Sequence, residues 1–330
     1  MGERSILRDV AQAAGVSLRT ASRVLNDDPR VAAATRERVQ GVMKDLRYVP
    51  DLMARSLRGG TDATIGLVVE SIADPFFSEL VAAVESASSD AGKSVLVAST
   101  RADAGRELRV VTELLRRRVS GLLVVPTAGD HSWLARAAAP LVLVDRRAEG
   151  LDADMVGTDD KRAAFDAVAH LIAHGHRDVA YVGDYSRVST SAARLAGYRE
   201  AMAHYGLLVR DELVHADCPT ARAASAAMSS LLAGGRQPTA VFSAATRCSL
   251  GVVPVLHEHR RTDVAFVGFG DFAMADALVP AVTVVDHSGA AVGRAAVARL
   301  ARRISEPALM PEIVHVPVRL VERGSGELRP

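Results

Sequence analysis

Residues 7–26 read LRDVAQAAGVSLRTASRVLN, and this stretch decides the architecture of the N-terminal part of the chain. Apolar residues recur at helical spacing on both sides of Gly15, which predicts two short helices joined by a tight turn. Ser17 follows the glycine and is placed to cap the second helix with its hydroxyl. The stretch therefore predicts a helix-turn-helix, a motif whose second helix enters the major groove of DNA. A small helical hairpin with an ordinary solvated face is the alternative.

Charge is distributed unevenly along the 330 residues. Residues 1–60 hold 11 Lys and Arg against 7 Asp and Glu, a net charge of +4, and the other 270 hold 29 against 32, a net charge of −3. A basic head on a slightly acidic body is expected where only the head contacts nucleic acid.

The sequence gives no sign of export or of a membrane anchor. The two cysteines, Cys218 and Cys248, are far apart, which favours a reducing compartment without a disulfide framework. The N-terminus lacks an apolar signal core, and no run of about 20 apolar residues exists. We therefore expect a cytoplasmic protein that has no membrane partner.

Two segments follow the predicted motif. Thr35 is expected to open a third helix over residues 36–46, which would close a small three-helix core. Residues 51–58 have the period of a two-turn helix, capped by Asp51, and such a short helix forms only when docked. A plain interdomain linker is the alternative for this segment.

From residue 64 onward the pattern changes to short β-branched runs that alternate with amphipathic segments. The predicted strands are 65–69, 94–98, 121–125, 141–145, 179–183, 240–244 and 264–269, and the predicted helices are 77–91, 106–117, 161–174 and 194–205. This alternation predicts βαβ units and parallel sheets flanked by helices. An open α/β sheet binds its ligands at the carboxyl ends of its strands.

Taken together, these pieces resemble the LacI/GalR family of bacterial transcription regulators over nearly the whole chain. The motifs that carry the resemblance are DVAxxAGVSxxTxSRVLN at 9–26, TRERV at 35–39, LRYVPDLMARSL at 46–57, DPFF at 74–77, RRVSGLLV at 117–124, LVDR at 143–146, HLIAHGHRDVAYVG at 170–183, RLAGY at 194–198, VGF at 267–269 and VPVRLVERGS at 316–325. Each motif alone is weak, but their order is specific.

The resemblance implies an architecture of three parts. An all-α helix-turn-helix headpiece would span 1–50, a hinge helix 51–61, and an α/β core of the periplasmic-binding-protein type 62–330. The core would have two Rossmann-like lobes, the first about 62–158 and 290–317, the second about 159–289 and 318–326. Members work as homodimers on near-palindromic double-stranded operator DNA, and most often as repressors. The C-terminus lacks apolar heptads, so a dimer is favoured over a tetramer.

The family pattern also implies which residues contact DNA. Leu18, Arg19 and Arg23 match the base readers, and an arginine fork suits guanine. Leu57 matches a hinge leucine that wedges into the minor groove, and Ala54 would let two hinge helices pack closely. The expected contacts are Ser17, Leu18, Arg19, Thr20, Ser22, Arg23, Asn26, Thr35, Ala54 and Leu57.

A small-molecule effector is expected in the cleft between the lobes. The residues that match its binding positions are Phe76, Phe77, Asp145, Arg194, Asp271 and His287. Of these we expect Arg194 to be the strongest candidate, while Phe76 and Phe77 could equally be packing residues. No metal and no cofactor is expected, since the histidines at 170–176 suit a helix end better than a metal site.

The chain departs from the family pattern at the sugar-binding positions. Cys218, Ala245, Thr246 and Gly270 stand where polar or aromatic residues are common in the family. A buried group that loses its hydrogen-bond partner costs about 1–3 kcal/mol. We therefore expect an effector that is not an ordinary monosaccharide, or one that binds in a different pose.

Three other functions are weighed against an effector-controlled regulator. A solute-binding protein of a transport system would share the core fold but would not need the basic head. An enzyme is disfavoured because no catalytic constellation can be assembled. A regulator whose cleft no longer binds sugar stays open.

Overall fold

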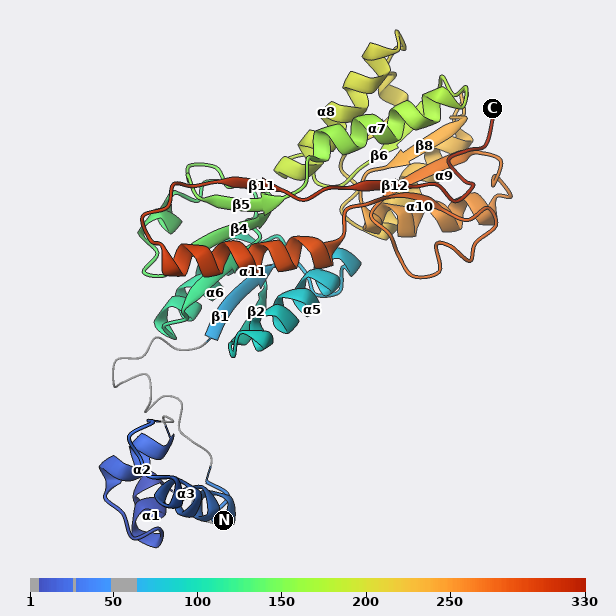
Figure 1. The fold of residues 1–330 in the computed structure, drawn as a ribbon. Helices are drawn as coiled ribbons and strands as arrows, with labels where there is room; N and C mark the ends of the chain where they lie inside the picture. Colours follow the sequence, from blue (N-terminus) through green and yellow to red (C-terminus); the bar gives the residue numbers. More distant parts are fainter. Residues whose placement is uncertain (1–5, 26–27, 49–63) are drawn as a thin grey trace. The chain divides into compact units, whose positions relative to one another are not determined.

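The computed structural model describes residues 6–25, 28–48 and 64–330, and the chain divides into two compact units, Met1–Asp62 and Ala63–Pro330 (Figure 1). The hinge expected at 51–61, which includes Ala54 and Leu57, lies outside the described residues, as does Asn26.

The first unit contains a helix-turn-helix, as predicted. Its helices are α1 (Leu7–Ala13), α2 (Leu18–Leu25) and α3 (Ala33–Asp45). Gly15 has a φ of +64°, a conformation that favours glycine, and so it makes the turn between α1 and α2. The buried residues are Val10, Ala11, Ala14, Ala21, Val24 and Val39. The apolar faces read from the sequence are therefore the ones that pack.

The third helix begins earlier than predicted. The sequence placed its start after Thr35, but α3 starts at Ala33 and its N-cap is Ala32, whose side chain makes no capping hydrogen bond. Alanine has the highest helix propensity of all residues, so the run at 32–34 extends the helix without a polar cap.

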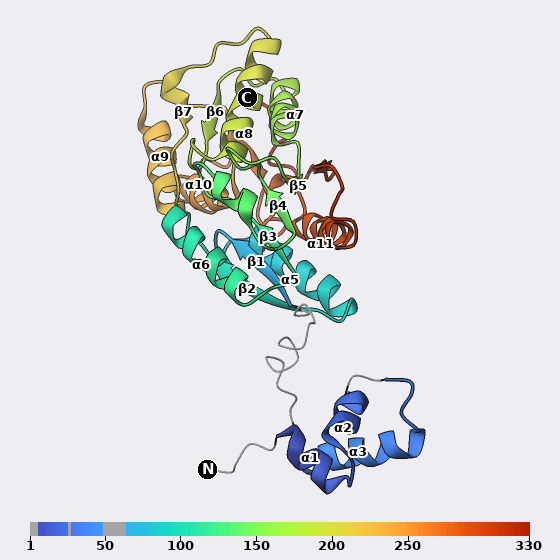
Figure 2. The same cartoon turned by 90° about the vertical axis from the view of Figure 1, so that its left-hand side faces the viewer.

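The first lobe of the core is a six-stranded parallel sheet in the order β11-β5-β4-β3-β1-β2. Its strands are β1 (Thr64–Val69), β2 (Ser94–Ser99), β3 (Gly121–Val124), β4 (Leu141–Asp145), β5 (Asp154–Gly157) and β11 (Ile313–His315). Helices α5 (Pro75–Asp90) and α11 (Gly289–Ser305) pack together on one face. Helix α6 (Ala104–Arg116) covers the other face (Figure 2).

The second lobe has the same plan, with the strand order β12-β10-β9-β8-β6-β7. Its strands are β6 (Val179–Val182), β7 (Val214–His215), β8 (Ala240–Ser243), β9 (Ala265–Phe269), β10 (Thr283–Asp286) and β12 (Arg319–Val321). Helices α7 (Asp160–Ala173) and α8 (Ser189–His204) cover one face, and α9 (Ala221–Ala233) and α10 (Thr246–Glu258) cover the other. Only β12 runs antiparallel to its neighbour.

The chain passes between the two lobes three times, after β5, after β10 and after β11. Figure 1 shows the last passage, where the C-terminal segment runs along both lobes. Two 3-10 helices, η1 (Ser132–Arg136) and η2 (Asp211–Leu213), complete the elements. All seven strands named from the sequence are present. No helix among the described residues is long and apolar enough to cross a membrane.

Candidate DNA-reading surface and effector cleft

The outward surface of α2 is built by its N-terminal cap. The Oγ atom of Ser17 accepts a hydrogen bond from the backbone N–H of Thr20 at 3.1 Å, so the predicted cap is confirmed. Ala21 and Val24 are buried, which turns Leu18 and Arg19 outward, and 40% of Leu18 is exposed. Helix α2 therefore presents an apolar and a basic side chain in its first turn, where a reading helix meets base edges.

The remaining candidates on this unit lie around the same helix. Thr20, Ser22 and Arg23 are partly exposed on α2, and Thr35 is partly exposed in the first turn of α3. Arg23 lies 3.6 Å from Asp28, the carboxylate that also binds Arg30 through both oxygens. The hydrogen bond from the Arg30 side chain holds the pKa of Asp28 well below its ordinary value.

A cleft lies in the core where the carboxyl ends of strands from both lobes meet. It encloses about 460 Å³ including its open mouth. Its lining residues are Glu70, Asp74, Phe76, Phe77, Asp145, Arg146, Asp184, Val188, Thr190, Ser191, Arg194, Ala245, Thr246, Arg247, Phe269 and His287.

Arg194 lies in this lining and is bound by its own lobe. Its Nε donates to Asp160 Oδ1 at 2.6 Å, and its Nη1 donates to the Ala244 carbonyl at 2.9 Å. The guanidinium also lies over the ring of Phe269, 3.8 Å from the centroid. Burial raises the pKa of Asp160 and outweighs the opposing effect of Arg194.

Phe76 and His287 form a stacked pair in the cleft. Their ring centroids are 4.3 Å apart and their planes differ by 7°, so the imidazole covers one face of the phenyl ring. Phe269 meets the edge of the same imidazole at 5.0 Å. Burial, assisted by the charge of Arg194, lowers the pKa of His287 well below its ordinary value. His287 is therefore a neutral aromatic at pH 7.

A buried ion-pair chain forms the first-lobe wall of the cleft. Arg146 binds Asp145 at 2.9 Å and Glu70 at 3.2 Å, and all three side chains are buried. Burial alone would raise the pKa of Glu70, but Arg146 and Arg247 outweigh it and lower that pKa. Asp145 has a φ of +69°, a strained backbone conformation for a residue other than glycine that is more common at functional sites.

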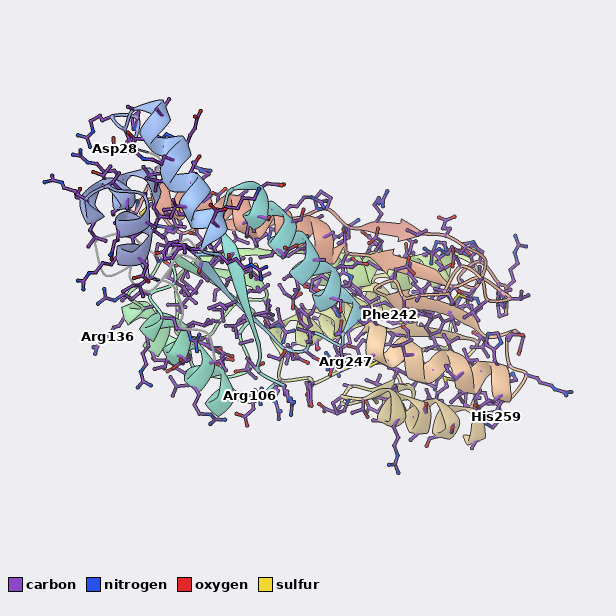
Figure 3. All side chains as sticks on the ribbon, turned by 90° about the horizontal axis from the view of Figure 1, so that it is seen from below. Asp28, Arg106, Arg136, Phe242, Arg247 and His259 are labelled. Atoms are coloured by element: carbon purple, nitrogen blue, oxygen red, sulfur yellow. The ribbon has the colours of Figure 1, made fainter. Side chains whose placement is uncertain are left out.

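Arg247 joins the two walls by ion pairs. It extends from α10 of the second lobe and reaches Glu70 at 2.7 Å and Asp74 at 3.3 Å, both in the first lobe. Its Nε also lies 3.2 Å from Asp184 of its own lobe. Figure 3 shows Arg247 where the lobes meet. These contacts tie the lobes together across the cleft.

Five of the six effector candidates lie together in the cleft lining, and one does not. Asp271 lies in an adjoining depression with Glu79, Asp286 and His287. Both of its carboxylate oxygens bind the Arg323 guanidinium, at 2.9 and 2.5 Å. That ion pair lowers the pKa of Asp271. Phe77 lines the cleft but is also packed in the first-lobe core.

The four departures from the family pattern occupy different surroundings. Gly270 has a φ of +92°, and a Cβ atom there would collide with the Thr246 hydroxyl and crowd His287. Glycine at 270 and threonine at 246 therefore depend on each other. Ala245 lines the cleft beside Thr246. Cys218 is buried in the second-lobe core, and Cys248 donates a weak hydrogen bond to its carbonyl at 3.5 Å.

Several lining residues were not among the candidates predicted from the sequence, above all Glu70, Asp184 and Arg247. Glu70 and Asp184 come at or just after the carboxyl ends of the predicted strands 65–69 and 179–183, so the strand-end rule could have found them. Arg247 follows the predicted strand 240–244 by three residues, but its partners have no local signal, because they depend on which strands of the two lobes face each other. The described residues contain no cluster of three or more side chains that could hold a metal ion.

Two lobes with a lined cleft define a ligand-binding core, and a helix-turn-helix unit with an outward basic helix defines a DNA-binding head. Both parts match known families. Residues 6–51 match the family model of bacterial regulatory proteins, lacI family, and residues 168–326 match a periplasmic binding protein-like domain.

Whole-chain relatives show the same combination. The HTH-type transcriptional regulator GalR of Escherichia coli is 32% identical over 94% of this chain and 92% of its own length. The ribose operon repressor of Escherichia coli is 30% identical over 97% of this chain and 99% of its own. A lac repressor dimer bound to operator and the anti-inducer ONPF superposes with a TM-score of 0.88 at 27% identity, covering 98% of this chain and 99% of that one.

The chain belongs to the LacI family of bacterial transcriptional regulators. It is therefore a DNA-binding regulator with an effector-binding core, and not an enzyme. The transport-protein alternative shares only the core fold and does not account for the DNA-binding head.

Proposed function

We propose that this regulator is a cytoplasmic homodimeric repressor that binds a near-palindromic operator and responds to a small molecule in the interlobe cleft. The observation that carries the proposal is the outward first turn of α2, in a chain whose core holds a charged cleft. Two copies related by a two-fold axis would place two such helices on two half-sites. The lac repressor structure, a dimer on its operator, supports this arrangement.

The DNA contact proposed for each residue follows from the exposure and the chemistry of its side chain. Arg19 and Arg23 would read guanine and Leu18 would make apolar base contact. Thr20, Ser22, Asn26 and Thr35 would hold phosphates, and Ser17 positions the helix N-terminus beside them. Ala54 and Leu57, in the hinge proposed for 51–61, would pack against the partner hinge and open the minor groove. The headpiece would end at residue 50.

The effector would bind among Phe76, Phe77, Asp145, Arg194 and His287, with Asp271 at the margin. Binding would shift the relative placement of the two lobes and, through it, the population of the DNA-binding state. CelR, a 30%-identical regulator that superposes with a TM-score of 0.73 over 98% of this chain and all of its own, is solved as a cellobiose complex. In this chain, the arginines that line the cleft are held in ion pairs with carboxylates.

Selection of DNA sequences by the full-length chain, followed by fluorescence anisotropy, tests the function. We expect enrichment of a two-fold symmetric site, and an affinity for it that falls steeply with salt because phosphates are neutralised. The Arg236→Ala variant should bind the same site with the same affinity, since that arginine makes an exposed ion pair with Asp178 in the core. Binding without sequence preference, or enrichment of an asymmetric single half-site, would contradict the proposal.

A further inference from the structure

The charges that line the cleft do not balance. Four lining carboxylates, Glu70, Asp74, Asp145 and Asp184, face three guanidinium groups, and Asp160 adds a fifth carboxylate behind Arg194. His287 is neutral at pH 7 and contributes no positive charge. With every carboxylate ionised, the cluster therefore has an excess of two negative charges.

The three arginines differ in how firmly they are held. Arg146 and Arg194 are buried and bind carboxylates of their own lobe. Arg247 is 22% exposed, and two of its three carboxylate partners belong to the opposite lobe. Parting of the lobes would separate Arg247 from Glu70 and Asp74 and leave Arg146 and Arg194 in place. Arg247 is thus the cation that an entering ligand can displace.

Displacement of Arg247 would leave three carboxylates, those of Glu70, Asp74 and Asp184, without their shared guanidinium partner. Glu70 would keep Arg146, but Asp74 would keep only the backbone N–H of Phe76, which it accepts at 3.1 Å. Burial already raises the pKa of Asp74. Hydroxyl groups can also donate to these carboxylates, but they carry no positive charge, so they would leave one more negative charge of the cluster unbalanced than Arg247 does. An anionic ligand would add to the excess charge.

One face of each of two aromatic rings in the cleft is already covered. His287 covers Phe76, and the Arg194 guanidinium covers Phe269. A sugar ring that stacks on either of these faces would have to break the contact there. A ligand that exchanges with Arg247 leaves both contacts intact.

We propose that the effector of this cleft carries a protonated amine or guanidinium group, which takes the place of Arg247 among Glu70, Asp74 and Asp184. The inference rests on the cleft being the effector site proposed above. It assigns the charge class of the ligand, and it makes Arg247 an internal competitor that holds the lobes together while the cleft is empty. The effector would release that tie and supply its own cation.

The test uses Arg247→Ala in the full-length chain, with methylguanidinium as the probe and methylurea as its neutral counterpart of the same shape. We expect methylguanidinium to raise the Tm of this variant in a saturable way, with an apparent Kd at least tenfold lower than that of methylurea. The Arg247→Ala/Glu70→Gln double variant should lose most of that preference. Arg247→Gln, which keeps hydrogen-bond donors, serves as a second variant if the alanine variant does not fold.

Arg236→Ala is the matched surface control, because it removes an arginine from the exposed Asp178 pair and should gain no saturable response. Equal stabilisation by methylurea, or no stabilisation of either Arg247 variant by methylguanidinium, would overturn the proposal. The readout needs no DNA. Failure of the proposed function would instead appear as loss of sequence preference in the wild-type chain.

Discussion

The first turn of α2 and the interlobe cleft both carry arginines, but the arginine on α2 is exposed and those of the cleft are paired with carboxylates. Arg19 lies exposed on α2, and no hydrogen bond or ion pair joins it to another described residue. In the cleft, Arg146, Arg194 and Arg247 are each held by carboxylates. An exposed arginine is available to a partner and adds little to stability. Removal of a buried paired arginine instead leaves an uncompensated buried carboxylate, and such an arginine must leave that carboxylate before it can bind a ligand.

Arg194→Ala tests how much a buried arginine of the cleft contributes to stability, and its expected effect is the largest. The variant leaves Asp160, which is 5% exposed, without its guanidinium, and it leaves the Ala244 carbonyl without that donor. Removal of one partner of a buried pair costs about 3–5 kcal/mol, so we expect the free energy of unfolding of the core to fall by that amount. Urea denaturation followed by circular dichroism measures it.

The surface variant Arg236→Ala provides the control for that measurement. Its exposed pair with Asp178 should contribute only about 0–1 kcal/mol. A loss below about 1 kcal/mol for Arg194→Ala, equal to the surface control, would show that the cleft pairs stabilise no more than exposed ones.

Arg19→Ala tests the headpiece side. We expect the free energy of unfolding to change by less than about 0.5 kcal/mol, because an exposed side chain away from any packing feature is lost. Discrimination at one base pair of each half-site should fall by about 1–3 kcal/mol, as the bidentate fork to guanine disappears. Anisotropy titrations against a set of single-base operator variants measure both the position and the size of the effect.

Arg19→Lys separates charge from geometry in the same assay. Lysine keeps the charge but not the planar fork, so it should restore general affinity more than discrimination. An equal loss of affinity on every sequence, with discrimination intact, would mean that Arg19 holds a phosphate.

His287→Phe tests whether the cleft is sensitive to pH in the way its burial implies. The folded pKa of His287 lies below the ordinary value of 6.5, so the unfolded chain binds the proton first as the pH falls. Stability is therefore fully present above pH 6.5 and is lost toward the folded pKa, by at most about 1.4 kcal/mol per pH unit for one proton. Phenylalanine keeps an aromatic ring against Phe76 and removes the proton site.

The measurement is the difference in unfolding free energy between variant and wild type from pH 7.5 down to 5. We expect the variant to gain stability relative to wild type as the pH falls. Taking the difference removes the contributions of His176 and His215, whose pKa values burial also lowers, and of His131, whose pairing with Glu107 raises its pKa. A constant difference across this range would contradict a neutral buried His287.

The sequence was sufficient for features that depend on local periodicity. The turn at Gly15, the cap at Ser17 and the strands at 65–69 and 141–145 follow from spacing within a few residues. The strands β5, β7, β10, β11 and β12, of two to four residues each, were not among the strands named from the sequence.

The cleft was less predictable because its geometry joins distant parts of the chain. Arg247 and Glu70 are 177 positions apart, and the sequence of neither segment indicates that the two side chains meet. Gly270 was noted only as a departure from the family pattern, and neither its φ of +92° nor the Thr246 hydroxyl that excludes a side chain there could be read from the sequence. Five of the six effector candidates lie in the cleft lining. They were chosen by their match to family motifs, which indicate residues that meet in the fold although they are far apart in the sequence.

Ser17→Ala has the smallest expected effect, and it tests the N-cap of α2 in the headpiece. The Oγ atom of Ser17 accepts from the Thr20 N–H and also lies 2.9 Å from the Thr20 hydroxyl, so its loss leaves the start of α2 uncapped. An N-cap contributes about 1 kcal/mol, which is roughly a fivefold change in a local equilibrium. We expect the Thr20 amide to exchange about fivefold faster in hydrogen-exchange measurements on the full-length chain.

Ser17→Asp separates the cap from the proposed DNA contact at the same position. Aspartate also caps a helix, so protection of the Thr20 amide should return, while its negative charge beside phosphate should weaken DNA binding. Ser17→Ala should weaken binding only through the frayed helix, by a factor no larger than the change in exchange. If alanine weakens binding far more than it speeds exchange, Ser17 itself contacts DNA. The exposed surface of α2 would then include its cap as well as Arg19.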